Sequence, residues 1–117
     1  MEFDRLTVGL LMGRDDAPEL TAEEEDTLQD AHLAHLAGLH EAGVLLAAGP
    51  LQDRNASFRG LVMLSVDADE ARPLLERDPA VRAGRFDIVL LPWLVPSGAM
   101  AFSPTRFPHS MAEAAGP

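Results

Sequence analysis

The chain has 117 residues, of which 47% are hydrophobic and 24% charged, with a formal net charge of −10 at pH 7. These values predict one globular domain, and no apolar run approaches the roughly 20 residues of a membrane-spanning helix. The absence of cysteine excludes disulfides, thiolate catalysis and cysteine-ligated metal centres. Nine arginines against 19 acidic residues create a field that repels polyanions, so we expect no nucleic acid and no membrane surface as a partner.

The N-terminal residues predict a cytoplasmic location and then a β-strand. Residues 1–5 lack the basic start and apolar stretch of a secretory signal. Apolar residues then alternate imperfectly from Phe3 and run together up to Met12, followed by Gly13 and the polar residues 14–18. This pattern is typical of a strand that ends in a loop.

An amphipathic helix is predicted between Thr21 and Ala42. Thr21 and Glu24 have the spacing of a capping box, in which each side chain accepts a hydrogen bond from the backbone N–H of the other residue. Gly43 suits the position where the helix ends, because glycine readily adopts the left-handed conformation found there.

The apolar stripe of this helix includes a histidine. At about 100° per residue, His32 points in nearly the same direction as Leu36 and Leu39. Burying an imidazole without a partner costs on the order of 1 to 3 kcal/mol, so we expect a polar group from elsewhere in the fold to contact it. Two interpretations are open: His32 is a catalytic residue, or it is a core histidine whose hydrogen bonds are satisfied.

Two short apolar runs follow, at residues 44–48 and 61–66, and predict two strands joined by an exposed loop. Gly49 and Pro50 close the first run. Their first role is to end the strand, and a second candidate role is to shape the wall of a pocket.

A second helix and a last strand complete the pattern. Asp67 or Asp69 can cap the helix, and Asp78-Pro79 ends it because a residue before proline avoids the α conformation. Residues 86–94 predict the strand, in which Pro92 indicates an edge or an end. Trp93 is large enough to seal a core or an interface, and stacking on an aromatic ligand is the alternative.

This order of elements predicts an α+β fold of the ferredoxin-like βαββαβ type, with a four-stranded antiparallel sheet and two helices on one face. The other face would be uncovered, yet the runs at residues 44–48 and 88–91 are apolar at successive positions. Two sheets packed face to face would bury it, so we expect a homodimer. The predicted domain spans residues 1–95, and residues 96–117 form an irregular tail that is loose or packs on a partner subunit.

The other histidines do not predict a metal centre. His35 and His40 lie at about 60° and 80° from His32 around the helix, and no HExxH or carboxylate-spaced motif accompanies them. We expect His40 to face solvent near the helix C-terminus, where a positive charge is favourable. His109 in the tail has no assignable role.

Three arginines are further candidates for contact with an acidic substrate. Arg59, Arg82 and Arg85 could meet a carboxylated or phenolic molecule, but exposed arginines usually do nothing specific. They are therefore left out of the predicted site.

The stretch from Ala31-His32 to Gly49-Pro50, with Asp78-Pro79 downstream, resembles the YciI-like (YCII-related) proteins in the order and spacing of its motifs. The resemblance implies a dimeric α+β barrel of ferredoxin-like subunits, whose pocket holds a histidine and an aspartate. By position these are His32 and Asp78. Many relatives have an arginine where this chain has Gln29, so the resemblance carries no anion-binding role to that position.

The family includes a type similar to a dehydrochlorinase of a chlorinated hydroxyquinone, which uses a His/Asp pair and implies no metal or organic cofactor. On this basis we expect a small cofactor-independent enzyme that transfers a proton, in an isomerisation or elimination, on a small and possibly aromatic molecule. His32 would be the general base and Asp78 would orient it. Gly49, Pro50 and Trp93 are the predicted substrate-binding residues.

Two other functions remain open. The protein could be a non-catalytic dimeric module that binds a small molecule or assists an enzyme, with His32 and Asp78 providing packing and pocket polarity. A cofactor-free oxygenase ranks last, because only analogy with other dimeric α+β barrels favours it.

Overall fold

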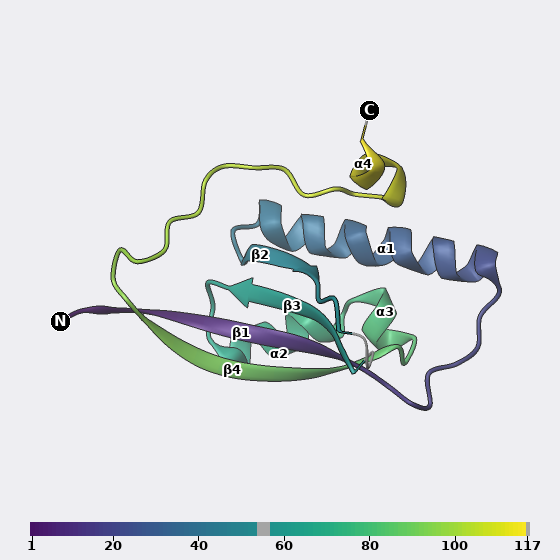
Figure 1. Cartoon of the computed structure of the whole chain (residues 1–117), viewed down its shortest axis with the longest axis horizontal. Coiled ribbons are helices and arrows are strands. Elements are labelled where there is room, and N and C mark those ends of the chain that lie inside the picture. Colours follow the sequence, from purple (N-terminus) through teal and green to yellow (C-terminus); the bar gives the residue numbers. More distant parts are fainter. Residues whose placement is uncertain (54–56, 117) are drawn as a thin grey trace.

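A computed structural model describes residues 1–53 and 57–116 of the chain (Figure 1). The predicted order of four strands and two main helices is confirmed, and two short helices, α3 and α4, add to it. The elements are β1 (Phe3–Gly13), α1 (Ala22–Glu41), β2 (Leu45–Pro50), β3 (Phe58–Leu64), α2 (Ala68–Glu76), α3 (Pro79–Arg82), β4 (Phe86–Pro96) and α4 (Met111–Ala115). The predicted loop between β2 and β3 includes residues 54–56, which lie outside the described residues.

The four strands form one antiparallel sheet in the order β2-β3-β1-β4. This is the predicted ferredoxin-like α+β architecture. The edge position inferred from Pro92 is confirmed, because β4 pairs only with β1 in the sheet and Pro92 stands opposite Thr7. Pro50 likewise ends β2 at the other edge.

The caps of the helices follow the sequence closely. Thr21 Oγ1 accepts a hydrogen bond from Glu24 N at 3.1 Å, and Glu24 Oε1 accepts one from Thr21 N at 3.1 Å, so the capping box of α1 is complete. Gly43 has a φ of +80°, as expected just past a helix end. Of the two candidate caps of α2, the residue that acts is Asp67, whose carboxylate accepts from Glu70 N.

Helices α1 and α2 bury one face of the sheet. Leu36 and Leu39 of α1, Leu75 of α2 and Leu64 of β3 belong to a single core cluster. A Cβ atom on Gly9 of β1 would lie 2.6 Å from Val62 Cγ2, which is closer than real Cβ contacts, so glycine permits this packing. We refer to this side as the covered face.

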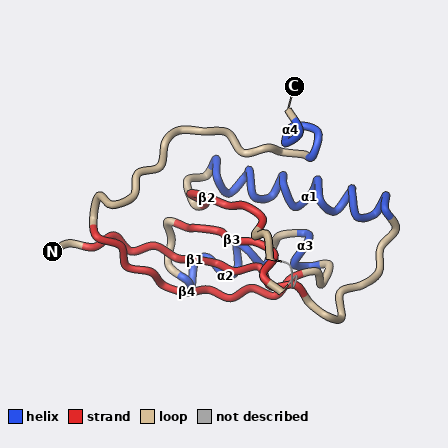
Figure 2. Tube along the Cα trace, in the orientation of Figure 1, coloured by secondary structure: helices blue, strands red, loops and turns tan. Residues whose placement is uncertain are grey.

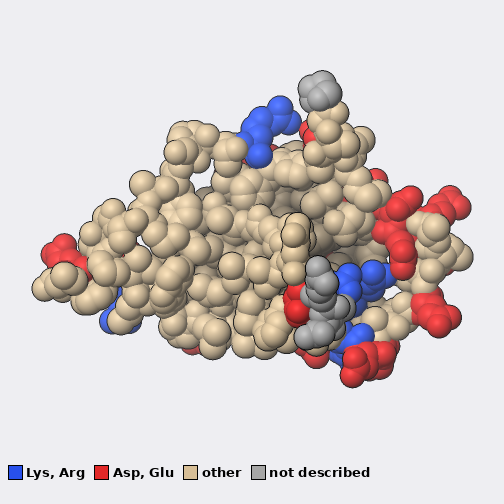
Figure 3. Space-filling model, viewed as in Figure 1, with Lys and Arg blue, Asp and Glu red and all other residues tan. Residues whose placement is uncertain are grey.

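The opposite side of the sheet, which we call the open face, is also apolar. Because successive residues of a strand point to opposite faces, the partners of β1, β3 and β4 identify its members. Its apolar members include Leu6, Val8, Leu10, Met12, Leu61, Met63, Val89, Leu91 and Trp93, and the same alternation places Asp4 and Asp87 on this face near its ends. In Figure 3 the surface over β1 and β4 bears almost no charged side chains between its two ends.

Most of the tail has no regular secondary structure, and one short helix, α4, lies near its end. β4 continues to Pro96, and the chain then turns back along α1 and ends in α4 (Figure 2). Ser110 caps α4 by accepting from Glu113 N at 3.1 Å. In the described part of the chain, no helix combines the length and apolar character needed to cross a bilayer.

Candidate active site

The polar partner expected for His32 is Asp78. The ring Nδ1 of His32 lies 2.6 Å from Asp78 Oδ2, and the two residues are 8% and 1% exposed. The pair therefore joins α1 to the segment between α2 and α3, 46 positions apart in the sequence. This contact agrees with the positions that the family resemblance implied.

Local structure fixes the carboxylate of Asp78. The Asp-Pro step ends α2 and begins α3, with Asp78 as the N-cap of α3 and Pro79 in its first turn. Asp78 Oδ1 accepts a hydrogen bond from Ala80 N at 2.9 Å, which leaves Oδ2 for the imidazole. The Asp-Pro step, which the sequence predicts to end a helix, thus also orients the carboxylate of Asp78.

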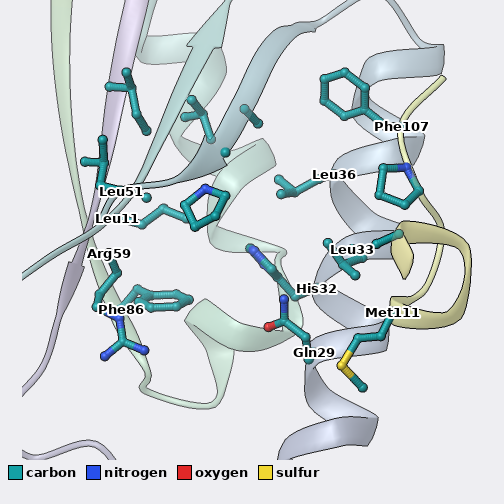
Figure 4. A pocket seen from close by; sticks show the side chains of 18 residues that line it. Leu11, Gln29, His32, Leu33, Leu36, Leu51, Arg59, Phe86, Phe107 and Met111 are labelled. Atoms are coloured by element: carbon teal, nitrogen blue, oxygen red, sulfur yellow. The ribbon is translucent and has the colours of Figure 1, made fainter. Parts of the chain in front are cut away.

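The hydrogen bond to Asp78 determines the tautomer of His32. A carboxylate only accepts hydrogen bonds, so Nδ1 carries the proton and donates it. In the neutral ring Nε2 then keeps its lone pair and can accept a proton. The His32 ring projects from α1 toward the space between Phe86 and Leu36 (Figure 4).

This space is a pocket of about 630 Å³, within the range of about 300–1,000 Å³ typical of small-molecule sites. Gln29, His32 and Arg59 are its polar side chains, and the rest of its lining is apolar or backbone. The Phe86 ring lies 6.0 Å from the His32 ring, centroid to centroid, at an interplanar angle of 53°. Gly49 and Pro50, at the end of β2, line this pocket, as the sequence predicted for their second candidate role.

Trp93, predicted to bind substrate, does not line this pocket. It stands opposite Leu6 on the open face, and 41% of its surface is exposed. The reason is strand alternation: Trp93 is seven positions after Phe86 along β4, an odd offset, so the two side chains point to opposite faces. Phe86 is the aromatic residue of β4 that contacts His32, and the period of the strand was the signal that could have identified it.

Arg59 is a second residue that the sequence analysis left out. It and Phe86 line both the His32 pocket and a smaller neighbouring pocket. The arginines beside it in the smaller pocket are paired, Arg14 with Asp16 and Asp87 and Arg85 with Glu25. Across residues 1–53 and 57–116, Arg59 has no ion-pair partner, so its charge is available to a ligand.

The other histidines of α1 contact backbone. His35 Nε2 lies 2.9 Å from the carbonyl oxygen of Leu74, and His40 Nδ1 lies 2.8 Å from that of Leu45. The expectation that His40 faces solvent is wrong, because the ring also stacks on Phe107 of the tail. Among the described residues, no group of three or more His, Asp or Glu side chains is arranged to hold a metal ion.

Fold and site together define a ferredoxin-like α+β protein with a histidine–aspartate pair beside an apolar pocket. A family model described as the YCII-related domain matches residues 10–93, which is most of the chain. The protein belongs to this family.

A solved structure of similar fold is 5-chloro-2-hydroxyhydroquinone dehydrochlorinase (TftG) from Burkholderia phenoliruptrix AC1100, in complex with 2,5-dihydroxybenzoquinone. The match covers 75% of this chain and 92% of that chain, with 21% sequence identity and a TM-score of 0.56. At this identity the similarity shows the fold. No curated protein matches the sequence.

Proposed function

We propose that the protein is a small cofactor-independent enzyme in which His32 removes a proton from a small molecule held in the pocket. The observation that carries the proposal is the 2.6 Å contact between His32 Nδ1 and a buried carboxylate, at a ring that lines a cavity of about 630 Å³. Asp78 orients the ring and stabilises the imidazolium that forms when Nε2 takes a proton.

The electron pair left by the proton stays on the substrate. In an isomerisation the proton returns from His32 to another atom of the same molecule. In an elimination the pair expels a leaving group such as a halide from the adjacent carbon. In both cases the substrate becomes more negative as the proton leaves, and Arg59 is the cation in the pocket lining that can stabilise this charge.

The substrate class we propose is a hydroxylated ring or another enolisable small molecule. The apolar lining, with Phe86 tilted beside His32, suits a flat ring. The structural neighbour carries the name of a dehydrochlorinase of a chlorinated hydroquinone and holds a dihydroxybenzoquinone. Halogenated hydroxyhydroquinones are therefore the first molecules to test.

We propose further that two copies of the chain associate through their open faces. Exposed apolar residues lie on this face, among them Leu91 and Trp93 at 49% and 41% exposure. The acidic residues that give the chain its net charge of −10 lie mainly elsewhere, so face-to-face packing brings few like charges together. We propose a cytoplasmic homodimer with no nucleic-acid partner.

The test is an assay of hydroxyhydroquinones with and without a halogen, in which quinone absorbance and halide release are measured. We expect His32→Gln to lower kcat/KM by about 100- to 10,000-fold, the usual contribution of a general base. His35→Gln is the matched control, since His35 lies on the same helix, its Nε2 contacts the backbone carbonyl of Leu74, and it does not line the pocket described for His32. Equal activity in wild type and His32→Gln would refute the proposal.

The alternative is a module that binds a small molecule without turnover. Calorimetric titration with 2,5-dihydroxybenzoquinone separates the two functions. Binding without turnover of any halogenated or hydroxylated ring would favour the binding module, whereas binding with turnover that depends on His32 supports the enzyme.

A further inference from the structure

The pocket of His32 is completed by residues beyond the family domain. The match to the family ends at residue 93, yet Phe107, Pro108, Met111 and Ala114 line the pocket. In Figure 4, Phe107 and Met111 lie on the side of the pocket away from Arg59 and Phe86. We propose that residues 97–116, here called the C-terminal segment, form a wall of the substrate site, in which Phe107 and Met111 select the substrate. This inference rests on the proposed function.

Polar and stacking contacts attach the segment to α1, including one between His40 Nε2 and the carbonyl oxygen of Thr105 at 3.2 Å. The Phe107 ring stacks on His40 with centroids 3.8 Å apart and planes 6° apart. His109 Nε2 lies 2.6 Å from Glu41 Oε1. Met111 N donates to Asp30 Oδ1 at 2.8 Å in a partly buried hydrogen bond.

The positions of these contacts relate the segment to the base. Asp30 and His40 lie on either side of His32 along α1, so the helix that carries the imidazole also carries the wall that faces the pocket. Two anchor points on one rigid helix fix both the distance and the orientation of the segment. Motion of α1 therefore moves base and wall together, and the spacing between them is set by the helix.

The internal contacts of the segment support a defined wall. Glu113 N donates a hydrogen bond to Ser110 Oγ at 3.1 Å, and Glu113 Oε2 accepts one from His109 N at 2.6 Å. Glu113 Oε1 also lies 3.3 Å from Arg106. These contacts hold the turn that presents Met111 to the pocket.

The chemistry of the wall indicates what it selects. A phenylalanine ring and a thioether are apolar and polarisable, and both make favourable contacts with flat rings. The segment adds no charged side chain to the pocket lining. A substrate would therefore place an apolar edge against Phe107 and Met111 and an acidic oxygen toward His32 and Arg59, and larger ring substituents would be rejected at the wall.

The first experiment measures the reactivity of His32 and does not require turnover. Diethyl pyrocarbonate acylates unprotonated imidazole nitrogens, and peptide mass spectrometry follows its rate at each histidine. We expect the rate at His32 to rise severalfold in a variant that ends at Pro96 and to rise in Met111→Ala. Phe102→Ala is the control, because Phe102 belongs to the segment, is 41% exposed and does not line the pocket.

The second experiment compares substrates that differ in the size of one ring substituent. Met111→Ala and Phe107→Ala are expected to shift the ratio of kcat/KM in favour of the larger substrate by about 10- to 200-fold, the range for apolar pockets. An unchanged ratio together with unchanged His32 reactivity, in variants that keep the circular dichroism of the wild type, would overturn the inference. If no substrate is found, the reactivity of His32 still decides it. If the shortened chain fails to fold, Met111→Ala provides the result.

Discussion

The covered face and the open face of the sheet carry similar apolar side chains and differ in what buries them. On the covered face, α1 and α2 bring Leu64 to 0% exposure and enclose Asp78 at 1%. On the open face, Leu91 keeps 49% of its surface exposed. The difference teaches that the elements of one chain enclose the core and the His32 pocket, whereas the open face of one chain keeps large apolar side chains exposed.

The largest effect is expected from a charge on the open face. Trp93→Asp would place two carboxylates in an apolar interface between copies, where like charges cost several kcal/mol, so we expect the dissociation constant to rise on the order of 1,000-fold. Light scattering coupled to size exclusion measures the change. The His32 pocket should still bind ligand, because Trp93 lies on the opposite face. A wild-type protein that is monomeric at high concentration would contradict the dimer.

The next largest effect is expected in the core of the covered face. Leu64→Ala should lower the free energy of unfolding by about 2–5 kcal/mol, because it removes a fully buried side chain and leaves a cavity. Leu94→Ala is the matched control on the same sheet, with 54% of the residue exposed. Its cost should stay within about 0.5 kcal/mol, as for most surface substitutions. Urea denaturation of both variants makes the comparison, and equal costs would mean that the two positions are buried alike.

A loss of stability of similar size is expected when the carboxylate beside His32 is removed. Asp78→Ala leaves the imidazole Nδ1 and the backbone N–H of Ala80 without their acceptor, at a cost of about 1–3 kcal/mol for each buried group left unsatisfied. Asp78→Asn keeps the shape and should alter the tautomer of His32 more than the stability. Nitrogen-15 NMR of the ring reports the tautomer. A His32 spectrum that is identical in wild type and Asp78→Asn would show that Asp78 does not orient the base.

The smallest effect is expected at the capping box, which lies at the N-terminus of α1. Thr21→Ala should cost about 1 kcal/mol of stability, the usual value for an N-cap. Hydrogen bonds from Thr21 lower the pKa of Glu24 below its ordinary value of 4.5. A pKa that is lowered in the folded state stabilises the protein at pH values above the ordinary pKa of 4.5. This contribution is lost as the pH falls through the pKa of the folded state.

The contribution of the carboxylate can be checked against pH with a second variant, Glu24→Gln, which removes the charge. The difference in stability between wild type and Glu24→Gln should be greatest near neutral pH and should shrink below about pH 4.5, as the Glu24 carboxylate is protonated. Chemical denaturation at a series of pH values measures it. A difference that grows on acidification would exclude the ionised capping box as the cause.

Much of the fold was predictable because its signals are local. The capping box, Gly43 and the Asp-Pro step each act over a few residues, and all three end or begin a helix in the structure. The position of His32 on an apolar stripe is equally local, and it correctly predicted that a polar group meets the ring. The identity of that group came from the family resemblance.

The residues that surround the pocket were harder to predict, because they meet only through tertiary packing. Trp93 and Phe86 belong to one strand and differ in the face to which they point. Arg59 lacks any local motif, and the absence of an ion-pair partner for it within residues 1–53 and 57–116 is visible only once its neighbours are placed. Phe107 and Met111 lie in a segment whose sequence has no hydrophobic periodicity. Contacts with α1 determine where this segment lies.

The sequence by itself determined the order of elements, the antiparallel ferredoxin-like sheet and the histidine on the buried stripe of α1, since hydrophobic period, caps and breakers depend on near neighbours in the chain. Only the tertiary structure decided that the carboxylate of Asp78 meets Nδ1 of His32, that Arg59 stays without a partner in the described chain, and that the tail borders the pocket. These features depend on distances between segments that are remote in sequence, which packing and loop paths set and no local pattern encodes.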